Sequence, residues 1–244
     1  MQVSFIMKYL ILFMVWWNAN PIIPVAAGSA PDHSAWQQLL QEFVNDKGDV
    51  AYARFKIREN ELTRYLDYLA DHAPAATWTR NETLAYYINL YNAATIALIL
   101  EHYPTESIRD IWRPWGQNRV RVGDKTISLG DIEHKILRKM NEPRIHFAIN
   151  CASFSCPKLR SEAYKADKLE AQLHAATVDF INDPTRNILS RNKLELSAIF
   201  KWYKIDFTGK NTLINYIQKY TKLRLAADAK ITYLSYDWRL NESR

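Results

Sequence analysis

Leu84-Ala-Tyr-Tyr-Ile-Asn-Leu-Tyr-Asn-Ala-Ala-Thr-Ile-Ala-Leu-Ile-Leu100 is the stretch that decides the fold, because almost every position in it is apolar. Only Asn89, Asn92 and Thr95 are strongly polar. A helix that is apolar around its whole circumference belongs in the middle of a protein core. We therefore expect a long, buried central helix.

Local signals mark both ends of this helix. The hydroxyl of Thr79 can cap the first turn while Glu82, three residues later, reaches back to complete a capping box. Pro104 follows Tyr103 and cannot continue a helix. These signals predict a helix over about residues 79–103.

Two amides lie three residues apart on one side of the expected helix, at Asn89 and Asn92. Burying an amide without partners costs about 1–3 kcal/mol in proteins. Buried polar groups are for this reason almost always hydrogen-bonded. We expect both side chains to have hydrogen-bond partners.

The remaining patterns predict more helix than strand. Helical spacing of apolar residues indicates helices over residues 36–44, 60–72, 129–140, 167–182 and 211–220, with helical turns near Phe200. Alternation on both sides of Gly123-Asp124 predicts a β-hairpin. Extended segments are expected at residues 50–55, 145–151, 187–189, 194–196 and 230–234, the second of them a buried strand. The expected fold is α+β, a mostly helical single domain whose central helix packs on a small, mainly antiparallel sheet.

The N-terminus has the parts of a signal peptide. Lys8 precedes a short apolar run, and the small residues that follow suit cleavage after Ala27 or Ala30. The run, residues 9–17, is far shorter than the about 20 residues of a membrane-spanning helix, and no later segment is expected to be long enough. Residues 1–30 are therefore predicted to be removed on export, leaving residues 31–244 as one periplasmic or secreted domain without a transmembrane span.

The expected mature chain is modestly basic. Removing Lys8 from the 32 Lys and Arg residues leaves 31, and 31 minus 26 Asp and Glu residues gives +5. Residues 201–244 hold nine basic and four acidic residues, so the excess sits at the C-terminal end. This charge suits an envelope substrate or a protein partner as well as a solvated face. Nucleic acid is not expected for an exported protein without a recognised binding motif, and no cofactor is expected.

Cys151 and Cys156 are the only cysteines in the chain. In an oxidising compartment, two closely spaced cysteines most simply form a disulfide, and a loop of this size can close. The spacing differs from that of a C-x2-C pair and no second pair exists, so no metal site is expected. The alternative is a nucleophilic thiol, which needs a nearby histidine or helix end to stabilise the thiolate.

Ser128 begins the expected helix over residues 129–140, with Asp131 as a weaker capping partner. At 100° per residue, Glu133 falls on the apolar face of this helix, so its carboxylate is expected to point inward. His134 points away from that face. Glu133 is interpreted either as a carboxylate that orients a catalytic partner or as half of a structural ion pair with Arg or Lys.

His146 lies in the expected strand over residues 145–151. Side chains alternate along a strand, so His146 and Asn150 share one face and Cys151 lies on the other. A turn beginning at Asn150 would still rotate the thiol toward the histidine. His146 is therefore either a satisfied core or edge residue or a general base, and the second role needs a nucleophile within hydrogen-bond reach.

Several motifs together resemble one known family. They are Tyr87-Ile-Asn-Leu-Tyr-Asn-Ala93, Asp131-Ile-Glu-His-Lys-Ile-Leu-Arg138, His146-Phe-Ala-Ile-Asn-Cys-Ala-Ser-Phe-Ser-Cys-Pro157, Phe180-Ile-Asn-Asp-Pro184 and Lys201-Trp-Tyr203. A chain with these motifs resembles the domain of unknown function 547 family, found in bacteria and in longer plant and animal proteins. Since that family's activity is unassigned, the resemblance implies a fold and a shared set of polar residues rather than a reaction.

The expected arrangement is also loosely similar to papain-like and transglutaminase-like folds. Those enzymes carry their nucleophilic cysteine at the start of the central helix. The corresponding region here holds Asn89 and Asn92 and no cysteine. A nucleophilic thiol would therefore be supplied by Cys151 or Cys156.

Our functional hypothesis is a thiol-dependent hydrolase or acyl transferase that acts on an envelope amide or ester. In it Cys151 attacks a carbonyl, His134 or His146 accepts its proton, and Glu133 orients the base. Substrate binding is assigned to Asn89, Asn92 and Asn150, the last two as candidate oxyanion donors.

Two hypotheses compete with it. The first is a non-catalytic periplasmic binding or assembly protein with a structural Cys151–Cys156 disulfide and a buried polar network. The second is a metal-dependent hydrolase that uses Glu133, His134 and His146, for which the ligand spacing gives little support.

Overall fold

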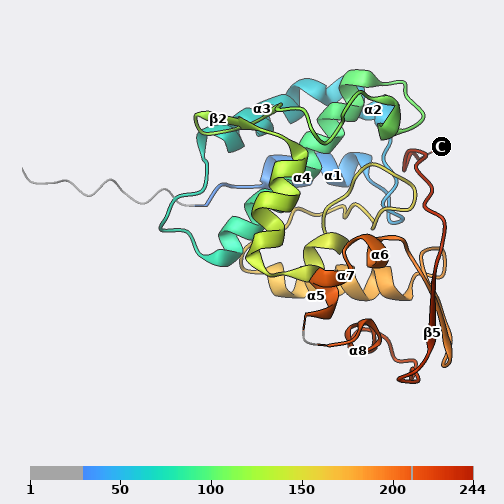
Figure 1. Ribbon diagram of the computed structural model, residues 1–244. Helices are drawn as coiled ribbons and strands as arrows, with labels where there is room; N and C mark the ends of the chain where they lie inside the picture. The colour runs from blue at the N-terminus through green and yellow to red at the C-terminus, as the bar shows by residue number, and fades with distance from the viewer. Residues whose placement is uncertain (1–29, 210, 244) are drawn as a thin grey trace, which may run out of the picture.

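The computed structural model of the protein describes residues 30–209 and 211–243, so the expected leader lies outside the described residues apart from Ala30. The chain is an α+β protein, about half helical, with small sheets. α4 (Arg80–His102) spans the centre of the molecule between two groups of elements (Figure 1). α1 (Ser34–Phe43) and α3 (Glu59–Asp71) lie toward one end of it, and α5 (Leu169–Asn182) toward the other.

The shorter helical segments connect and extend these helices. They are α2 (Tyr52–Phe55), η1 (Lys56–Arg58), η2 (Ile108–Asp110), η3 (Asp131–Ile136), η4 (Leu137–Met140), η5 (Pro143–Phe147), α6 (Ile199–Trp202), α7 (Lys204–Thr208) and α8 (Leu213–Gln218). The segment over residues 50–55, expected to be extended, is instead helical from Tyr52 to Phe55. Val50 forms isolated β-bridges with Val44 and Glu242.

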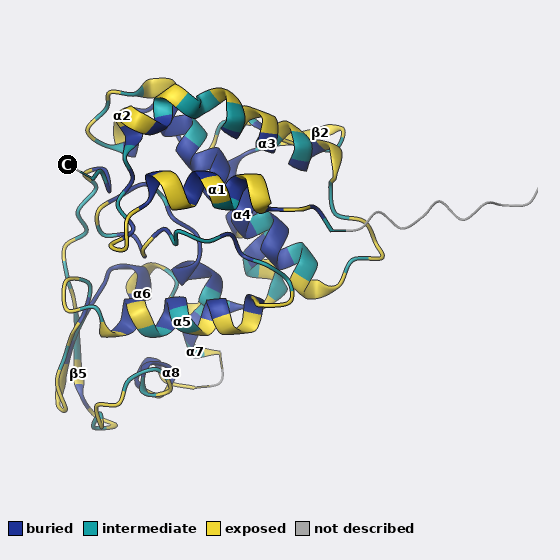
Figure 2. Cartoon of the chain, turned by 180° about the vertical axis from the view of Figure 1, so that it is seen from behind, coloured by how far each residue is buried: buried dark blue, intermediate teal, exposed yellow. Residues whose placement is uncertain are grey.

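The central helix is buried as its composition predicted. Fifteen of the 23 residues of α4 are buried, and Figure 2 shows it dark between the outer helices. Its direct packing partners include α2, α3 and the η3–η4 segment. By length and composition α4 could cross a membrane, which corrects the expectation that no later segment is long enough. However, 83% of its most apolar window is buried inside the protein, as in a core helix.

The capping box at the start of α4 is confirmed. The Glu82 backbone N–H donates to the Thr79 hydroxyl oxygen at 3.2 Å, and the Thr79 N–H donates to the Glu82 carboxylate at 2.7 Å. These bonds satisfy two groups that would otherwise lack partners at the helix start. The cap fixes where the core helix begins.

Replacing Thr79 by Ala is expected to lower the free energy of unfolding by about 1 kcal/mol, measured by urea denaturation. The matched control is Thr63→Ala. Thr63 lies on α3 with its hydroxyl donating to the Glu59 carbonyl at 3.1 Å, so it caps nothing and its removal should change stability little. Equal losses for the two variants would contradict the capping role.

Two small sheets complete the fold. β1 (Val120–Val122) and β2 (Lys125–Ile127) form the predicted antiparallel hairpin, with Gly123 in its turn at a φ of +57°. The second sheet has the order β3–β4–β5, in which β4 is antiparallel to β3 and parallel to β5. Its strands are Ile188–Leu189 (β3), Lys193–Leu196 (β4) and Lys230–Tyr233 (β5).

The core consists of two hydrophobic clusters that meet at η5. The larger cluster surrounds α4 and includes Ile145. The smaller one packs α5 against the three-stranded sheet and α6 to α8, and includes Phe147. His146 lies between these two residues in the chain, at the junction of the two clusters.

The expected strand over residues 145–151 is wrong. Residues 143–147 form the 3-10 helix η5, with Pro143 in its first turn and the Glu142 carboxylate accepting from the Arg144 N–H at 3.3 Å. Short apolar runs do not distinguish a buried strand from a buried helical turn. The alternation argument that separated His146 from Cys151 therefore no longer applies.

The helical segment expected over residues 129–140 is present but irregular. Its caps are confirmed, since the Asp131 N–H donates to the Ser128 hydroxyl at 3.0 Å and the Ser128 N–H donates to the Asp131 carboxylate at 3.1 Å. η3 is a π-helix, in which the Leu137 N–H reaches back to the Ile132 carbonyl. Such wide turns are frequent at functional sites.

Candidate functional site

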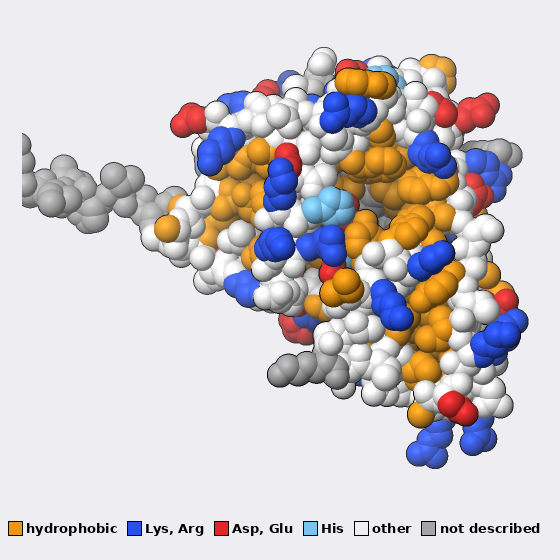
Figure 3. Space-filling model, in the orientation of Figure 1, with side chains coloured by type: hydrophobic (Ala, Val, Ile, Leu, Met, Phe, Trp, Pro, Cys, Tyr) orange, Lys and Arg blue, Asp and Glu red, His pale blue; other side chains and the backbone are white. Residues whose placement is uncertain are grey.

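One cleft collects the sequence-predicted acid, histidines and sulfurs. It has a volume of about 300 Å³, and its polar and sulfur-bearing lining residues are Glu133, His134, His146, Cys151 and Cys156. They come from η3, η5 and the loop after η5. Figure 3 shows hydrophobic side chains gathered around a hollow on this face of the molecule.

Aromatic side chains form most of the rest of the wall. They are Tyr91, Trp115, Trp202, Tyr203, Tyr236 and Trp238. Trp202, Tyr236 and Trp238 pack on one another with ring centroids 4.5–5.8 Å apart. Such contacts fix the rings and make a rigid, mainly apolar surface.

His146 is held in one orientation by a carboxylate and an aromatic ring. Its Nε2 lies 2.8 Å from Oδ2 of Asp206, and its ring stacks on Tyr203 with centroids 3.9 Å apart. In the part of the chain that the structure describes, the ring has no other hydrogen bond. A carboxylate accepts, so Nε2 carries a hydrogen and donates to Asp206, and Nδ1 has no hydrogen-bond partner among the described residues.

Asp206 joins His146 to Arg138. The Arg138 guanidinium donates to both carboxylate oxygens of Asp206, at 2.6 and 2.8 Å. Burial alone raises the pKa of the Asp206 carboxyl, but the hydrogen bonds from Arg138 and His146 outweigh it and hold the pKa well below its usual range. Asp206 is therefore an ionised carboxylate that orients the imidazole.

Glu133 points inward as predicted, with its side chain 9% exposed. Its closest basic group is His134, with 3.9 Å between Oε1 and Nδ1, and no Arg or Lys of residues 30–209 or 211–243 lies within 4.0 Å. The structural ion pair with Arg or Lys is therefore not formed within the described residues. The carboxylate instead accepts a hydrogen bond from the Tyr203 hydroxyl. Burial raises the pKa of Tyr203, and the nearby carboxylate raises it further.

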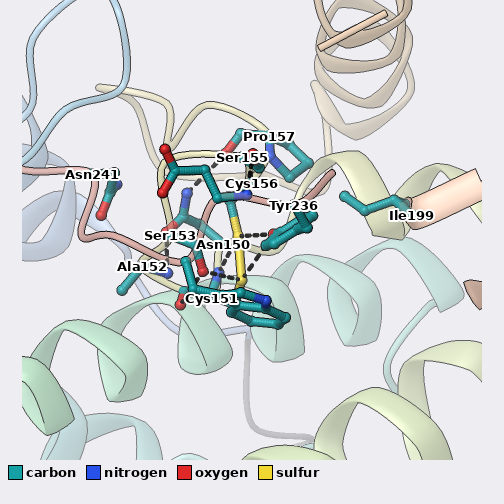
Figure 4. Close-up of a disulfide and its surroundings, with 12 residues drawn as sticks. Asn150, Cys151, Ala152, Ser153, Ser155, Cys156, Pro157, Ile199, Tyr236 and Asn241 are labelled. Atoms are coloured by element: carbon teal, nitrogen blue, oxygen red, sulfur yellow. Dashed lines mark hydrogen bonds between the residues drawn. A yellow bond between two sulfur atoms is a disulfide. The ribbon is translucent and has the colours of Figure 1, made fainter. Parts of the chain in front are cut away.

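Cys151 and Cys156 form a disulfide, with Cα atoms 6.3 Å apart (Figure 4). The Cys156 sulfur accepts two hydrogen bonds, from the Cys151 N–H at 3.0 Å and from the Tyr236 hydroxyl at 3.2 Å. The Cys151 sulfur contacts the hydroxyls of Ser153 and Tyr236 at 3.2 and 3.3 Å. Burial raises the pKa of Tyr236, so its hydroxyl keeps its hydrogen at neutral pH.

The three asparagines predicted to bind substrate do not line the cleft. Asn89 pairs with the backbone of Tyr164, donating to its carbonyl at 2.8 Å and accepting from its N–H at 3.0 Å. Asn92 donates to the Ala148 carbonyl and accepts from the Asn150 N–H. The expectation that both helix amides are hydrogen-bonded is confirmed, and both serve to fix the chain.

Asn150 braces the cysteine loop from within. Its amide donates to the Pro157 carbonyl at 2.8 Å, and its oxygen accepts from the Ala152 N–H at 2.7 Å. Ala152 has a φ of +60°, a region that non-glycine residues rarely occupy. The Asn150 side chain is thus engaged in holding a strained turn, and the geometry gives no support to its role as an oxyanion donor.

Sequence reasoning missed three residues that complete the site, namely Tyr203, Asp206 and Tyr236. Asp206 lies 60 residues from His146, and Tyr236 lies 85 residues from Cys151. No local spacing connects such distant positions. The one available signal was the Lys201-Trp-Tyr203 motif, which contains Tyr203 and lies three residues before Asp206.

The described residues contain no group of three or more His, Cys, Asp or Glu side chains arranged to hold a metal ion. Glu133, His134 and His146 line the same cleft without forming a ligand set. The metal-dependent alternative therefore gains no support from this geometry.

A family model described as "Protein of unknown function, DUF547" matches residues 75–181. The matched range contains α4, η3, η5 and both cysteines, and it ends before Tyr203, Asp206 and Tyr236. Comparison with curated proteins and with solved structures gives no match.

Proposed function

Since residues 75–181 of this chain form a DUF547 domain, whose description names no activity, we propose a function from the chemistry of its cleft. The proposed activity is that of a thiol-dependent hydrolase or acyl transferase acting on an amide or ester outside the reducing cytosol. The observation that carries the proposal is the gathering of Glu133, His146 and both cysteine sulfurs on the wall of a single cleft. Because a sulfur held in a disulfide cannot act as a thiolate nucleophile, the active form in this proposal is the reduced protein.

In the reduced form, His146 Nδ1 accepts the proton of the Cys151 thiol while Nε2–H stays hydrogen-bonded to Asp206. The thiolate attacks the substrate carbonyl carbon, and the imidazolium returns the proton to the leaving amine or alcohol as the thioester forms. Water or an acceptor amine then takes the acyl group and regenerates the thiol. Asp206, which sequence reasoning did not identify, takes the orienting role expected of Glu133.

One hydroxyl on the cleft wall suits the developing oxyanion. Burial raises the pKa of Tyr236, so this phenol stays protonated at neutral pH and can donate once the disulfide is open, whereas the one hydroxyl hydrogen of Tyr203 is engaged by Glu133. Glu133 accepts the hydrogen bond of Tyr203 and faces a mainly aromatic cleft without an Arg or Lys partner among the described residues. A buried carboxyl group there favours substrates that bring a hydrogen-bond donor.

The expected export fits this proposal. Disulfides persist in oxidising compartments and are rare in the cytosol. The expected leader over residues 1–30 and the Cys151–Cys156 disulfide both support the proposal of an envelope or secreted protein. Reduction in that compartment would be supplied by thiols from outside the protein.

The test is the alkylation of Cys151 by iodoacetamide in the pre-reduced protein near neutral pH. A thiolate stabilised by His146 should react roughly ten-fold or more faster than an ordinary thiol, and His146→Gln should remove that advantage. His134→Gln separates the two candidate bases, and His174→Gln, an exposed position on α5, is the control. Alkylation of Cys151 at the rate of an unfolded peptide would rule the proposal out.

The closed disulfide specifically favours a second candidate, a non-catalytic binding protein. In that case the two sulfurs only close the loop, and the aromatic wall binds an apolar group of an envelope partner. The same experiment discriminates, because a purely structural Cys151 should react slowly after reduction and should not respond to His146→Gln.

A further inference from the structure

The two sulfurs of the disulfide have different surroundings. Cys156 is buried, 3% exposed, whereas Cys151 is half-buried. A thiol that enters the cleft can therefore approach Cys151 more readily than Cys156. Thiol–disulfide exchange depends on which sulfur is accessible and on how well the other leaves as a thiolate.

A backbone donor also distinguishes the two sulfurs, because the Cys151 N–H donates to the Cys156 sulfur. The N–H lies 3.0 Å from the Cys156 sulfur, and the Tyr236 hydroxyl lies 3.2 Å from Cys156 and 3.3 Å from Cys151. Hydrogen bonds to a thiolate lower its pKa, so both groups can assist the departure of Cys156. Tyr236 keeps its hydrogen, and Trp202 and Trp238 pack against its ring at 4.8 and 4.5 Å. The hydroxyl is thus positioned before the bond opens (Figure 4).

We infer that the Cys151–Cys156 disulfide exchanges with low-molecular-weight thiols in the cleft, and that they attack Cys151 and expel Cys156. The incoming thiolate forms a new S–S bond with Cys151 while the Cys151–Cys156 bond breaks, and its electron pair stays on Cys156 as a thiolate. A second thiolate then attacks the mixed disulfide, which releases a small disulfide and leaves both cysteines reduced. Two thiols are oxidised and one protein disulfide is reduced.

This activity goes beyond the proposed acyl transfer, since it requires only the two sulfurs and their donors. If the protein has both the acyl-transfer and the exchange activity, exchange is the step that frees the Cys151 thiol. The two can also fail separately. Pre-reduced protein can show fast, His146-dependent alkylation even if exchange does not occur, and exchange can occur in a protein without acyl-transfer activity.

The decisive experiment treats the unreduced mature protein with glutathione, quenches with acid, alkylates the free thiol and maps the products by fragmentation mass spectrometry. Glutathione is expected on Cys151 and the alkyl group on Cys156. Glutathione on Cys156, an equal distribution, or a disulfide that stays closed in excess thiol would overturn the inference. This measurement uses the wild-type chain, so it does not depend on a variant folding.

A variant pair tests the role of the hydroxyl. Tyr236→Phe should slow opening roughly ten-fold, because one hydrogen bond to the leaving thiolate is lost. Tyr233→Phe, on β5 and 36% exposed, contacts neither sulfur and should leave the rate unchanged. Equal rates for Tyr236→Phe and wild type would overturn the role of the hydroxyl in opening the disulfide. The direction of attack is tested by the position of glutathione, because the hydroxyl lies close to both sulfurs.

Discussion

Replacing Asp206 by Ala is expected to lower the free energy of unfolding by about 2–4 kcal/mol. The carboxylate accepts two hydrogen bonds from Arg138 and one from His146, whose side chain is 2% exposed. Without it, a partly buried guanidinium and a buried imidazole lose their only carboxylate within 4.0 Å in the described residues. Urea denaturation monitored by tryptophan fluorescence measures the loss.

The control is Asp71→Ala, which removes a carboxylate from an exposed pair. Asp71 and Arg121 are 62% and 48% exposed and lie 2.8 Å apart. Exposed pairs contribute about 0–1 kcal/mol, so this variant should remain close to wild type. Similar losses for the two variants would contradict the special position of Asp206.

The contribution of Asp206 to the free energy of unfolding depends on pH in a direction that its pKa determines. The pKa is lower in the folded protein than the about 3.9 of an unfolded Asp, so folding favours the ionised carboxylate. Its contribution is fully present above about pH 4 and is lost as the pH falls through the folded-state pKa. The stability difference between wild type and Asp206→Ala should shrink below about pH 4. A difference that widens on acidification would show that the pKa direction is wrong.

The features that the sequence predicted correctly are local ones. α4 could be expected from one apolar run, its start from residues three apart, and the hairpin from alternation around Gly123. The buried position of Glu133 followed from helical periodicity, even though η3 is a π-helix rather than the regular helix expected. Each of these signals lies within one or a few turns of chain.

The incorrect or missing features depend on contacts that a local pattern does not contain. The apolar run at residues 145–149 reads equally well as a strand or as a helical turn, and the junction of two core clusters selects the turn. Asp206 reaches His146 only because α7 packs in the second cluster. The site was therefore predictable in its central residues and not in the groups that orient them.

Asn92→Ala is expected to destabilise the protein by about 2–4 kcal/mol and also to change the chemistry of the disulfide. The Asn92 side chain donates to the Ala148 carbonyl at 3.0 Å and accepts from the Asn150 N–H at 2.8 Å. All three residues are buried. Removing the side chain leaves both backbone groups without partners. Because Asn150 braces the turn at Ala152, the cysteine loop should become more mobile.

Asn89→Ala separates that local effect from general destabilisation. Asn89 is equally buried and also makes two hydrogen bonds, but to Tyr164 rather than to the cysteine loop. Both variants should lose similar stability. If Asn92→Ala lowers the free energy of local opening of the cysteine loop by about 1.4 kcal/mol, reduction of the disulfide by dithiothreitol should accelerate about ten-fold. In Asn89→Ala the rate of reduction should remain near that of the wild type. Equal acceleration in both would mean that the loop responds to global stability, and that α4 does not control the cysteines through Asn92.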